Sequence, residues 1–269
     1  MPSDFPIGVI DSGVGGLSVL KKIRQLLPNE ELLYVADSRY APYGERSKVA
    51  IKNRCFANMG FFELQHAKAL VLACNTATAA AVKELREAFD IPIIGMEPAI
   101  KPAADLTRTG VIGVLATAGT LDSDKYMNLQ SLFRDRVEII TKACPGLVDE
   151  IEKMHPDRGE IVKLVTEYTE AFLAKGGDTL VLGCTHYALI SEIISEIVGP
   201  GVVLVDTGMA VAKELKRRLQ ENDLLSDSSE AGRLSFFTSG HVEDQQVLIS
   251  RYWGEEVPVL HYMNFVLTI

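Results

Sequence analysis

Two cysteines stand in nearly identical surroundings and are the residues best placed to do chemistry. Cys74 lies in the run LVLACNT and Cys184 in the run LVLGCTH. Each apolar run predicts a buried parallel strand, and the residues that follow predict a helix, so each thiol should lie where a strand ends and a helix begins. Partial positive charge collects at a helix N-terminus, and we therefore expect the pKa of both thiols to be lowered.

Two thiols that face one another across a small molecule can invert a carbon centre. One cysteine, as a thiolate, removes a proton from one face, and the other returns a proton to the opposite face. A C–H group beside a carboxylate is a very weak acid, so donors must also stabilise the charge that develops. Polar residues of the same turns are the candidates for this role: Ser12, Asn75, Thr76, Thr117, Thr120 and Thr185. Asp11 and His186 stand beside them and are candidates to move protons to and from the thiols or to hold an ammonium group.

Several of these residues could instead have a purely structural role. A single cysteine after an apolar strand is most often packed in the core, but two of them in matched contexts favour function. Cys55, in a helical stretch, and Cys144, at the end of a strand-like run, are interpreted as structural. Asp11 has the alternative role of a helix N-cap.

The sequence matches the motifs of cofactor-binding and metal-binding sites poorly. The run after the first strand has Gly13 and Gly15, but Ser18 stands where the dinucleotide fingerprint requires a third glycine. Cys184 and His186 are too few ligands for a structural zinc site, so no metal is expected. No lysine stands in a context typical of pyridoxal phosphate enzymes, and we expect no cofactor.

Composition restricts the partners of the chain. Its 269 residues carry 27 basic and 36 acidic side chains, a formal charge of −9, without a basic stripe, so nucleic acid is not an expected partner. No apolar stretch is long enough to cross a membrane, and the first residues do not resemble a secretion signal. We expect a cytoplasmic protein in which the four cysteines remain thiols.

Strand-like runs alternate with helical segments along the chain, which predicts an α/β fold with mainly parallel sheets flanked by helices. The runs cover residues 6–11, 31–37, 68–74, 91–96, 110–116, 136–144, 178–184 and 202–207. The sequence also looks duplicated, because the run that begins at Gly8 parallels the run at Gly113, and the two cysteines repeat at nearly the same offset.

The duplication predicts two similar α/β domains related by a pseudo-twofold axis, with the active site between them. Residues 1–97 and 208–269 are expected to form the first, discontinuous domain, and residues 98–207 the second. The last part returns to the first domain because a helix and a late strand remain with no third domain to join.

The chain resembles the cofactor-independent aspartate/glutamate racemase superfamily over most of its length, and within it the glutamate rather than the aspartate enzymes. The likeness is carried by IGVIDSGVGGLSVL (7–20), YVADSRYAPYG (34–44), ALVLACNTATA (69–79), IPIIGMEPAIKPA (91–103), GVLATAGTLDSDKY (113–126) and LVLGCTHYALI (180–190). DSGVGGLSV and YGERS are the segments that favour glutamate.

The resemblance assigns roles to individual residues. It implies that Cys74 and Cys184 are the two acid/base residues and that the substrate is contacted by Asp11, Ser12, Tyr43, Gly44, Asn75, Thr76, Thr185 and His186. A family acidic residue falls near Glu152, but the segment after Cys144 departs from the family pattern, so Glu152, Glu150 or neither is expected at the site.

The resemblance also implies a biological role, D-glutamate supply for bacterial peptidoglycan synthesis. Because the chain starts directly at the first strand, we expect no activation by a cell-wall precursor of the kind that some members bind through an N-terminal extension. Members are often dimers, so a homodimer is one state that the resemblance allows. Two alternatives stay open: a related racemase acting on aspartate or another acid, and a non-enzymatic protein that binds a dicarboxylic amino acid.

Overall fold

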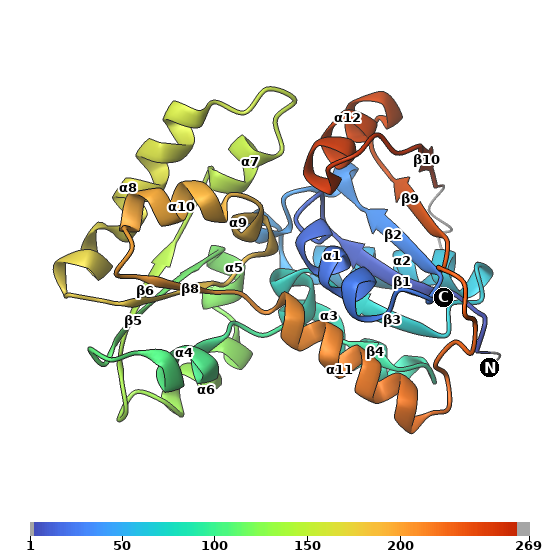
Figure 1. The fold of residues 1–269 in the computed structure, drawn as a ribbon, viewed down its shortest axis with the longest axis horizontal. Coiled ribbons are helices and arrows are strands. Elements are labelled where there is room, and N and C mark those ends of the chain that lie inside the picture. Colours follow the sequence, from blue (N-terminus) through green and yellow to red (C-terminus); the bar gives the residue numbers. More distant parts are fainter. Residues whose placement is uncertain (1–2, 263–269) are drawn as a thin grey trace.

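Two parallel β-sheets organise the chain, and each lies at the centre of one lobe of the computed structural model, which describes residues 3–262 (Figure 1). The first sheet runs in the order β10 (Val259–His261), β9 (Leu234–Thr238), β2 (Leu32–Ala36), β1 (Ile7–Asp11), β3 (Ala69–Leu72), β4 (Ile93–Ile94). The second runs in the order β6 (Glu138–Ala143), β5 (Val111–Ala116), β7 (Thr179–Leu182), β8 (Val203–Val205). The predicted fold class is confirmed.

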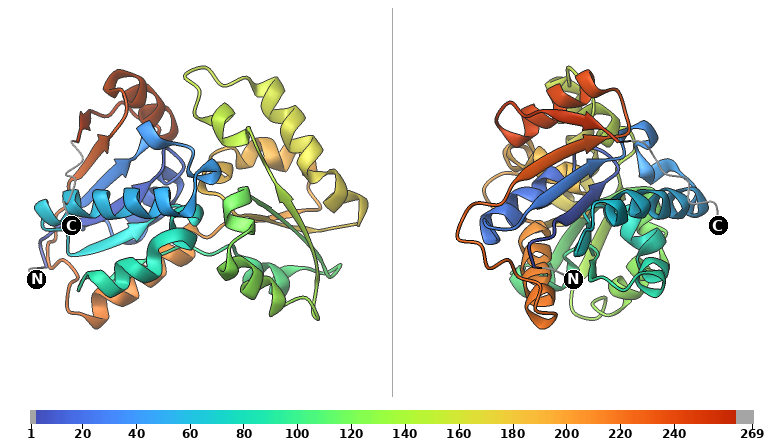
Figure 2. Two further views of the ribbon diagram at one scale, coloured as in Figure 1. Left: turned by 180° about the vertical axis from the view of Figure 1, so that it is seen from behind. Right: turned by 90° about the vertical axis from the view of Figure 1, so that its right-hand side faces the viewer.

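Helices cover both faces of each sheet, as the views in Figure 2 also show. The first lobe contains α1 (Leu17–Leu26), the 3-10 helices η1 (Ser38–Tyr40) and η2 (Tyr43–Glu45), α2 (Lys48–Leu64), α3 (Asn75–Ala88), α11 (Gly208–Glu221) and α12 (Val242–Trp253). The second contains α4 (Ile100–Leu106), α5 (Ala118–Leu121), α6 (Asp124–Ser131), α7 (Leu147–Ile151), α8 (Arg158–Ala174), α9 (Thr185–Leu189) and α10 (Ser191–Val198).

Strand side chains alternate between two apolar cores in each lobe, as the period of two requires. Val9 packs with α1, α11 and α12 on one face of the first sheet, and Ile10 packs with α2 and α3 on the other. Val114 and Leu115 divide in the same way between the two faces of the second sheet. Such double-sided burial explains why the strands read as continuous apolar runs.

The duplication seen in the sequence is present in the topology. The order β2-β1-β3-β4 in the first sheet is repeated as β6-β5-β7-β8 in the second. Both central strands carry a glycine where a helix crosses closely: a Cβ on Gly8 would lie 2.5 Å from the Phe62 ring, and one on Gly113 would lie 2.8 Å from the Phe172 ring. In both halves, a glycine in the central strand makes room for an aromatic ring of the helix that packs on it.

The chain passes from the first sheet to the second after β4 and returns after β8. We propose that the two lobes are the domains expected from the sequence, 1–97 with 208–269 and 98–207; residues 263–269 lie outside the described residues. The packing of α11 on α1 and the pairing of β9 with β2 support the return to the first lobe. Among residues 3–262, no helix is both long and apolar enough to span a bilayer.

Candidate active site between the lobes

The two cysteines occupy equivalent positions in the two lobes, as predicted. Cys74 follows β3 and is the N-cap residue of α3, and Cys184 follows the equivalent strand β7 and is the N-cap residue of α9. Their side chains are buried, and Cys184 is among the groups that raise the pKa of Cys74. Asp11, which also raises the pKa of Cys74, accepts a hydrogen bond from Thr185, the residue after Cys184, so the two strand ends meet although they come from different sheets.

The expected lowering of the thiol pKa is wrong for Cys74. Burial raises its pKa well above the ordinary value, and the nearby Asp11 carboxylate adds to the effect. The amide N–H of Ala77 approaches the Cys74 Sγ at 3.4 Å and acts in the opposite direction, but one N–H at the start of α3 does not offset the loss of water. Cys74 is consequently a thiol at neutral pH in this closed arrangement.

Asp11 ends β1 and is held by both lobes. Its Oδ1 accepts a hydrogen bond from the Gly13 amide at 2.8 Å, and its Oδ2 accepts one from the Thr185 hydroxyl, across the lobes, at 2.9 Å. Because α1 begins after Gly16 without a side-chain cap, the N-cap interpretation of Asp11 is wrong. Burial raises the pKa of Asp11 to about 6, opposed by the charge of His186. Ser12, also buried, donates to the same carboxylate at 3.3 Å.

A chain of contacts runs from Cys184 to the first lobe through His186 and Glu152. His186 Nδ1 lies 3.7 Å from Cys184 Sγ, and its Nε2 lies 2.6 Å from Glu152 Oε1. The same oxygen accepts the amide hydrogen of Val14, in the first lobe, at 2.7 Å. Burial alone lowers the pKa of His186, but its hydrogen bonds to Cys184 and Glu152 raise it well above the ordinary value, so the imidazole is protonated at neutral pH.

The question of Glu150 or Glu152 is thus answered by the geometry. Glu152 lies at the centre of the site, whereas Glu150 turns away and accepts hydrogen bonds from Lys153 and from the Asp157 amide. Sequence alone could not separate the two, since the choice depends on where α7 ends and how the next loop folds.

Asn75 offers unused hydrogen-bonding groups at the site. It is the first residue of α3 and is 95% buried, and neither the oxygen nor the nitrogen of its side-chain amide has a partner. Buried amides without partners are costly, and their presence here is typical of a position that a ligand satisfies.

Three threonine hydroxyls close the rim between α3 and α5. Thr76 Oγ1 lies 2.9 Å from Thr117 Oγ1 and 3.3 Å from Thr120 Oγ1, and the last two lie 3.0 Å apart. Thr76 belongs to the first lobe and the other two to the second, so the predicted threonines are brought together across the lobes. We refer to these three residues as the hydroxyl rim.

Gly44 lies beside the hydroxyl rim through its backbone, whereas the Tyr43 hydroxyl is bound elsewhere. Gly44 lies so close to Thr117 that a Cβ would approach the threonine side chain to 2.8 Å. The hydroxyl of Tyr43 points into the first lobe and donates to Asp37 at 2.5 Å.

Asp37 was missed from the sequence. It also accepts hydrogen bonds from Arg54, Asn58, Ser239 and Tyr262. These donors hold its pKa below the ordinary value although burial acts to raise it. A carboxylate at a strand end inside DSRYAPYG is the only signal that could have identified it.

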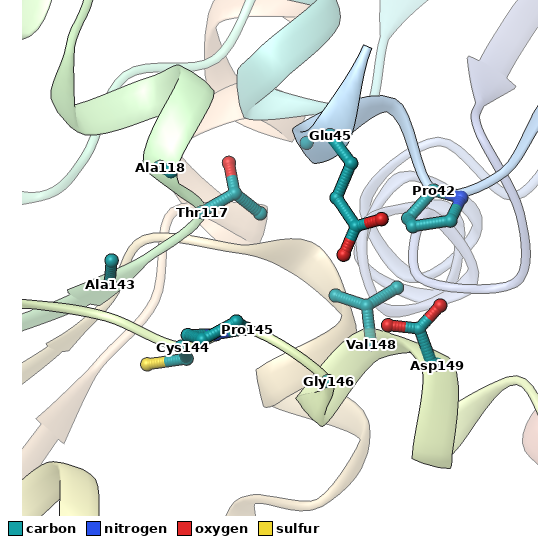
Figure 3. Close-up of a pocket in the computed structure, with 11 residues that line it drawn as sticks. Pro42, Glu45, Thr117, Ala118, Ala143, Cys144, Pro145, Gly146, Val148 and Asp149 are labelled. Carbon is teal, nitrogen blue, oxygen red and sulfur yellow. The ribbon is translucent and has the colours of Figure 1, made fainter.

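A cavity of about 120 Å³ lies between the lobes beside the hydroxyl rim (Figure 3). Gly44 is among the residues that line it. Glu45 and Thr117 lie on one side and Val148 and Asp149 of α7 on the other, and the two carboxylates point toward one another. Cys144, which also lines it, and Cys55 within α2 have pKa values that burial raises to about 12, so both are neutral thiols.

Comparison with known proteins connects this geometry to a family. The Asp/Glu/hydantoin racemase family model matches residues 7–215, which include both cysteines, Asp11, Glu152 and His186. The chain belongs to the Asp/Glu/hydantoin racemase family. The resemblance stated from the sequence motifs is confirmed.

Several proteins similar to the chain are named glutamate racemase. The glutamate racemase of Ectopseudomonas mendocina (strain ymp) is 50% identical over 258 residues, covering 96% of this chain and 98% of that protein. Glutamate racemase isoform RacE1 from Bacillus anthracis has a TM-score of 0.85 and 34% identity, covering 96% and 97%. Glutamate racemase from Francisella tularensis subsp. tularensis SCHU S4, solved in complex with D-glutamate, has a TM-score of 0.83 and 29% identity, covering 99% and 100%.

The family match ends within α11, at Leu215. The strands β9 and β10, which complete the first sheet, lie beyond it, as does the helix α12, which donates hydrogen bonds to carbonyls at and after the end of α7.

Proposed function

We propose that this chain is a glutamate racemase that interconverts L- and D-glutamate with Cys74 and Cys184 as its two acid/base residues. The observation that carries the proposal is the equivalence of the two cysteines: each follows the corresponding strand of one of two matching sheets and is the N-cap residue of the next helix, and both are buried where Asp11 and Thr185 join the lobes. The glutamate racemase names of the relatives, and the D-glutamate bound to one of them, support the choice of substrate.

In the proposed reaction, Cα of glutamate loses one proton and gains another on its opposite face. The thiolate of one cysteine takes the Cα hydrogen of glutamate as a proton, and the electron pair of the broken C–H bond delocalises into the α-carboxylate. The thiol of the other cysteine then gives its proton to the opposite face of Cα and becomes a thiolate. The product has inverted configuration, and the enzyme is left with the charge on the second sulfur.

Neighbouring groups are placed to prepare each cysteine. Asp11, whose negative charge raises the pKa of Cys74, would pair with the ammonium group of the substrate, and this pairing favours the Cys74 thiolate. On the other side, His186 lies close enough to exchange a proton with Cys184. Once Asp11 with Cys74, and His186 with Cys184, have returned to their starting protonation states, the enzyme can bind the same enantiomer again.

Donors in the turns after the strands would bind the two carboxylates of the substrate. The unpartnered amide of Asn75 and the hydroxyls of Ser12, Thr76 and Thr185 line the turns at both strand ends. Binding of the α-carboxylate by such groups stabilises the charge that develops as Cα loses its proton. Entry of the substrate to the site would require the lobes to separate, because both cysteines are buried where the lobes meet in this structure.

The wider role proposed for the chain follows the family resemblance. D-glutamate formed without a cofactor in the cytoplasm would supply peptidoglycan synthesis. Depletion of the protein should then stop cell-wall growth unless D-glutamate is added, and growth without either would contradict this role.

The activity is tested by following circular dichroism of either glutamate enantiomer with the purified protein and no added cofactor. In deuterium oxide, the product should carry solvent deuterium at Cα; product formed without label would exclude the two-thiol mechanism. Faster turnover of aspartate than of glutamate would favour the related racemase, and saturable binding without change in optical rotation would favour a binding protein.

A further inference from the structure

The C-terminal end of α7 is held by a helix from the other lobe. Tyr252 of α12 donates its hydroxyl hydrogen to the Ile151 carbonyl at 2.9 Å. Arg251 donates to the Met154 carbonyl at 2.5 Å and to the Lys153 carbonyl at 3.4 Å. The last carbonyls of a helix have no partner within it, and a guanidinium there also complements the negative end of the helix dipole.

Apolar packing lies beneath these hydrogen bonds. Tyr252 packs against the core of α1, α11 and α12 in the first lobe and also against the core of α7, α8 and α9 in the second. Met154, from the second lobe, packs against the first-lobe core. The contact therefore joins the two lobes through side chains as well as through carbonyl groups. We call Arg251, Tyr252 and the three carbonyls that they bind the α12 latch.

The latch surrounds the residue that links the lobes at the active site. Glu152 lies between Ile151 and Lys153, whose carbonyls are bound from α12, and its own carboxylate contacts Val14 and His186. A shift of α7 away from α12 would carry the Glu152 carboxylate away from the imidazole. The carbonyls on both sides of Glu152 are thus bound by donors from α12.

We propose that Arg251 and Tyr252 are positioning residues, which hold the end of α7 against the first lobe and so keep Glu152 on His186 when Cys184 exchanges its proton. This inference rests on the proposed racemase activity. Neither residue lies in the region that the family model matches, so the function assigned to α12 is additional to that of the matched segment.

The test compares Tyr252→Phe, Arg251→Met and the double variant with the unaltered protein. Arg217→Met is the matched control, since Arg217 is half-exposed on α11 and pairs with Glu214 and Glu221 of its own helix. Hydrogen exchange measured by mass spectrometry should become faster in residues 147–154 and at the Val14 amide in the latch variants alone. This readout does not depend on turnover.

Kinetics supply the second readout. We expect kcat to fall about tenfold in the double variant with KM changed less than about threefold, because proton transfer rather than binding is impaired. With Cα-deuterated substrates, the isotope effect should rise for one enantiomer only, the same one for which His186→Asn raises it.

Three results would overturn the proposal. Exchange in residues 147–154 that matches the unaltered protein would mean that the latch does not hold α7. Equal isotope effects for both enantiomers, with activity falling in parallel with the melting temperature, would indicate a merely structural role, as would equal losses in Arg217→Met. If the unaltered protein does not racemise glutamate, the proposed function fails, while the hydrogen-exchange comparison still decides whether the latch exists.

Discussion

Glu152 and His186 share a hydrogen bond of 2.6 Å at the centre of the interface between the lobes. The carboxylate oxygen that the imidazole contacts also accepts the Val14 amide, so one atom joins α7, the loop after β1 and the helix that begins at Cys184. A negative carboxylate in this position favours the imidazolium form of His186. Whether His186 holds the proton that it can exchange with Cys184 therefore depends on Glu152.

Glu152→Gln should lower the pKa of His186 toward its ordinary value, because a neutral amide no longer favours the imidazolium. A raised pKa means that the folded state binds the proton more tightly, so the stabilisation is complete below pH about 6.5 and is lost as pH rises through the folded-state pKa. NMR titration of the His186 ring measures the change directly. Glu150→Gln is the control, since Glu150 binds Lys153 and should leave the His186 titration unchanged.

Cys74→Ala and Cys184→Ala should each reduce racemisation by at least about 10³-fold while circular dichroism of the fold stays unchanged, since each removes one general acid/base group. Cys55→Ala is the matched control, because Cys55 is a buried, neutral thiol within α2 rather than at a helix N-cap, and this variant should retain near-normal turnover. Normal turnover in either strand-end variant would remove that cysteine from the mechanism.

Asp11→Asn should change how stability depends on pH. A buried carboxyl whose pKa rises from 3.8 to about 6 makes the folded protein less stable as pH increases through this interval, by up to about 3 kcal/mol. The asparagine variant lacks this decline, so its stability relative to the unaltered protein should rise between pH 4 and pH 6. Urea unfolding at several pH values measures the difference, and parallel curves for the two proteins would contradict the prediction. Racemisation should fall as well.

Lys68→Met should destabilise the first lobe by about 3–5 kcal/mol, because it leaves Glu30 charged and buried without its partner. Lys68 Nζ lies 2.6 Å from Glu30 Oε2, and both side chains are at least 97% buried. Urea unfolding should show partial recovery when Glu30→Gln is added. Lys83→Met, which removes an exposed pair with Glu87, should change stability by less than about 0.5 kcal/mol. A similar small loss for Lys68→Met would show that the buried pair contributes little.

The placement of the cysteines could be predicted because it depends on local pattern. An apolar strand followed by helix-forming residues fixes where Cys74 and Cys184 lie, and the repeated order implies matching sheets. The pKa of Cys74 could not be predicted in the same way, since a helix N-terminus is visible in sequence but the depth of burial is not.

Residues that act across the lobes were the hardest to find. Glu152 reaches the site through a loop whose path depends on tertiary contacts, and no sequence spacing separates it from Glu150. Arg251 and Tyr252 stand about 100 residues from the carbonyls they bind, on a helix whose sequence is that of an ordinary amphipathic helix. Asp37, whose donors all belong to the first lobe, was equally hidden, because it looks like a loop aspartate until these donors from distant segments are known.

The hydroxyl rim has a consequence for how the lobes part. Each of the three threonine hydroxyls carries a single hydrogen, so a cycle of three hydrogen bonds uses every donor that the rim possesses. Separation breaks the two bonds made by Thr76 but keeps the bond between Thr117 and Thr120, and water compensates most of the loss, at a net cost of about 1–3 kcal/mol. The same movement thus frees two O–H groups, that of Thr76 and that of the second-lobe threonine that donated to it. Under the proposed function, these groups would be available to bind an entering dicarboxylate.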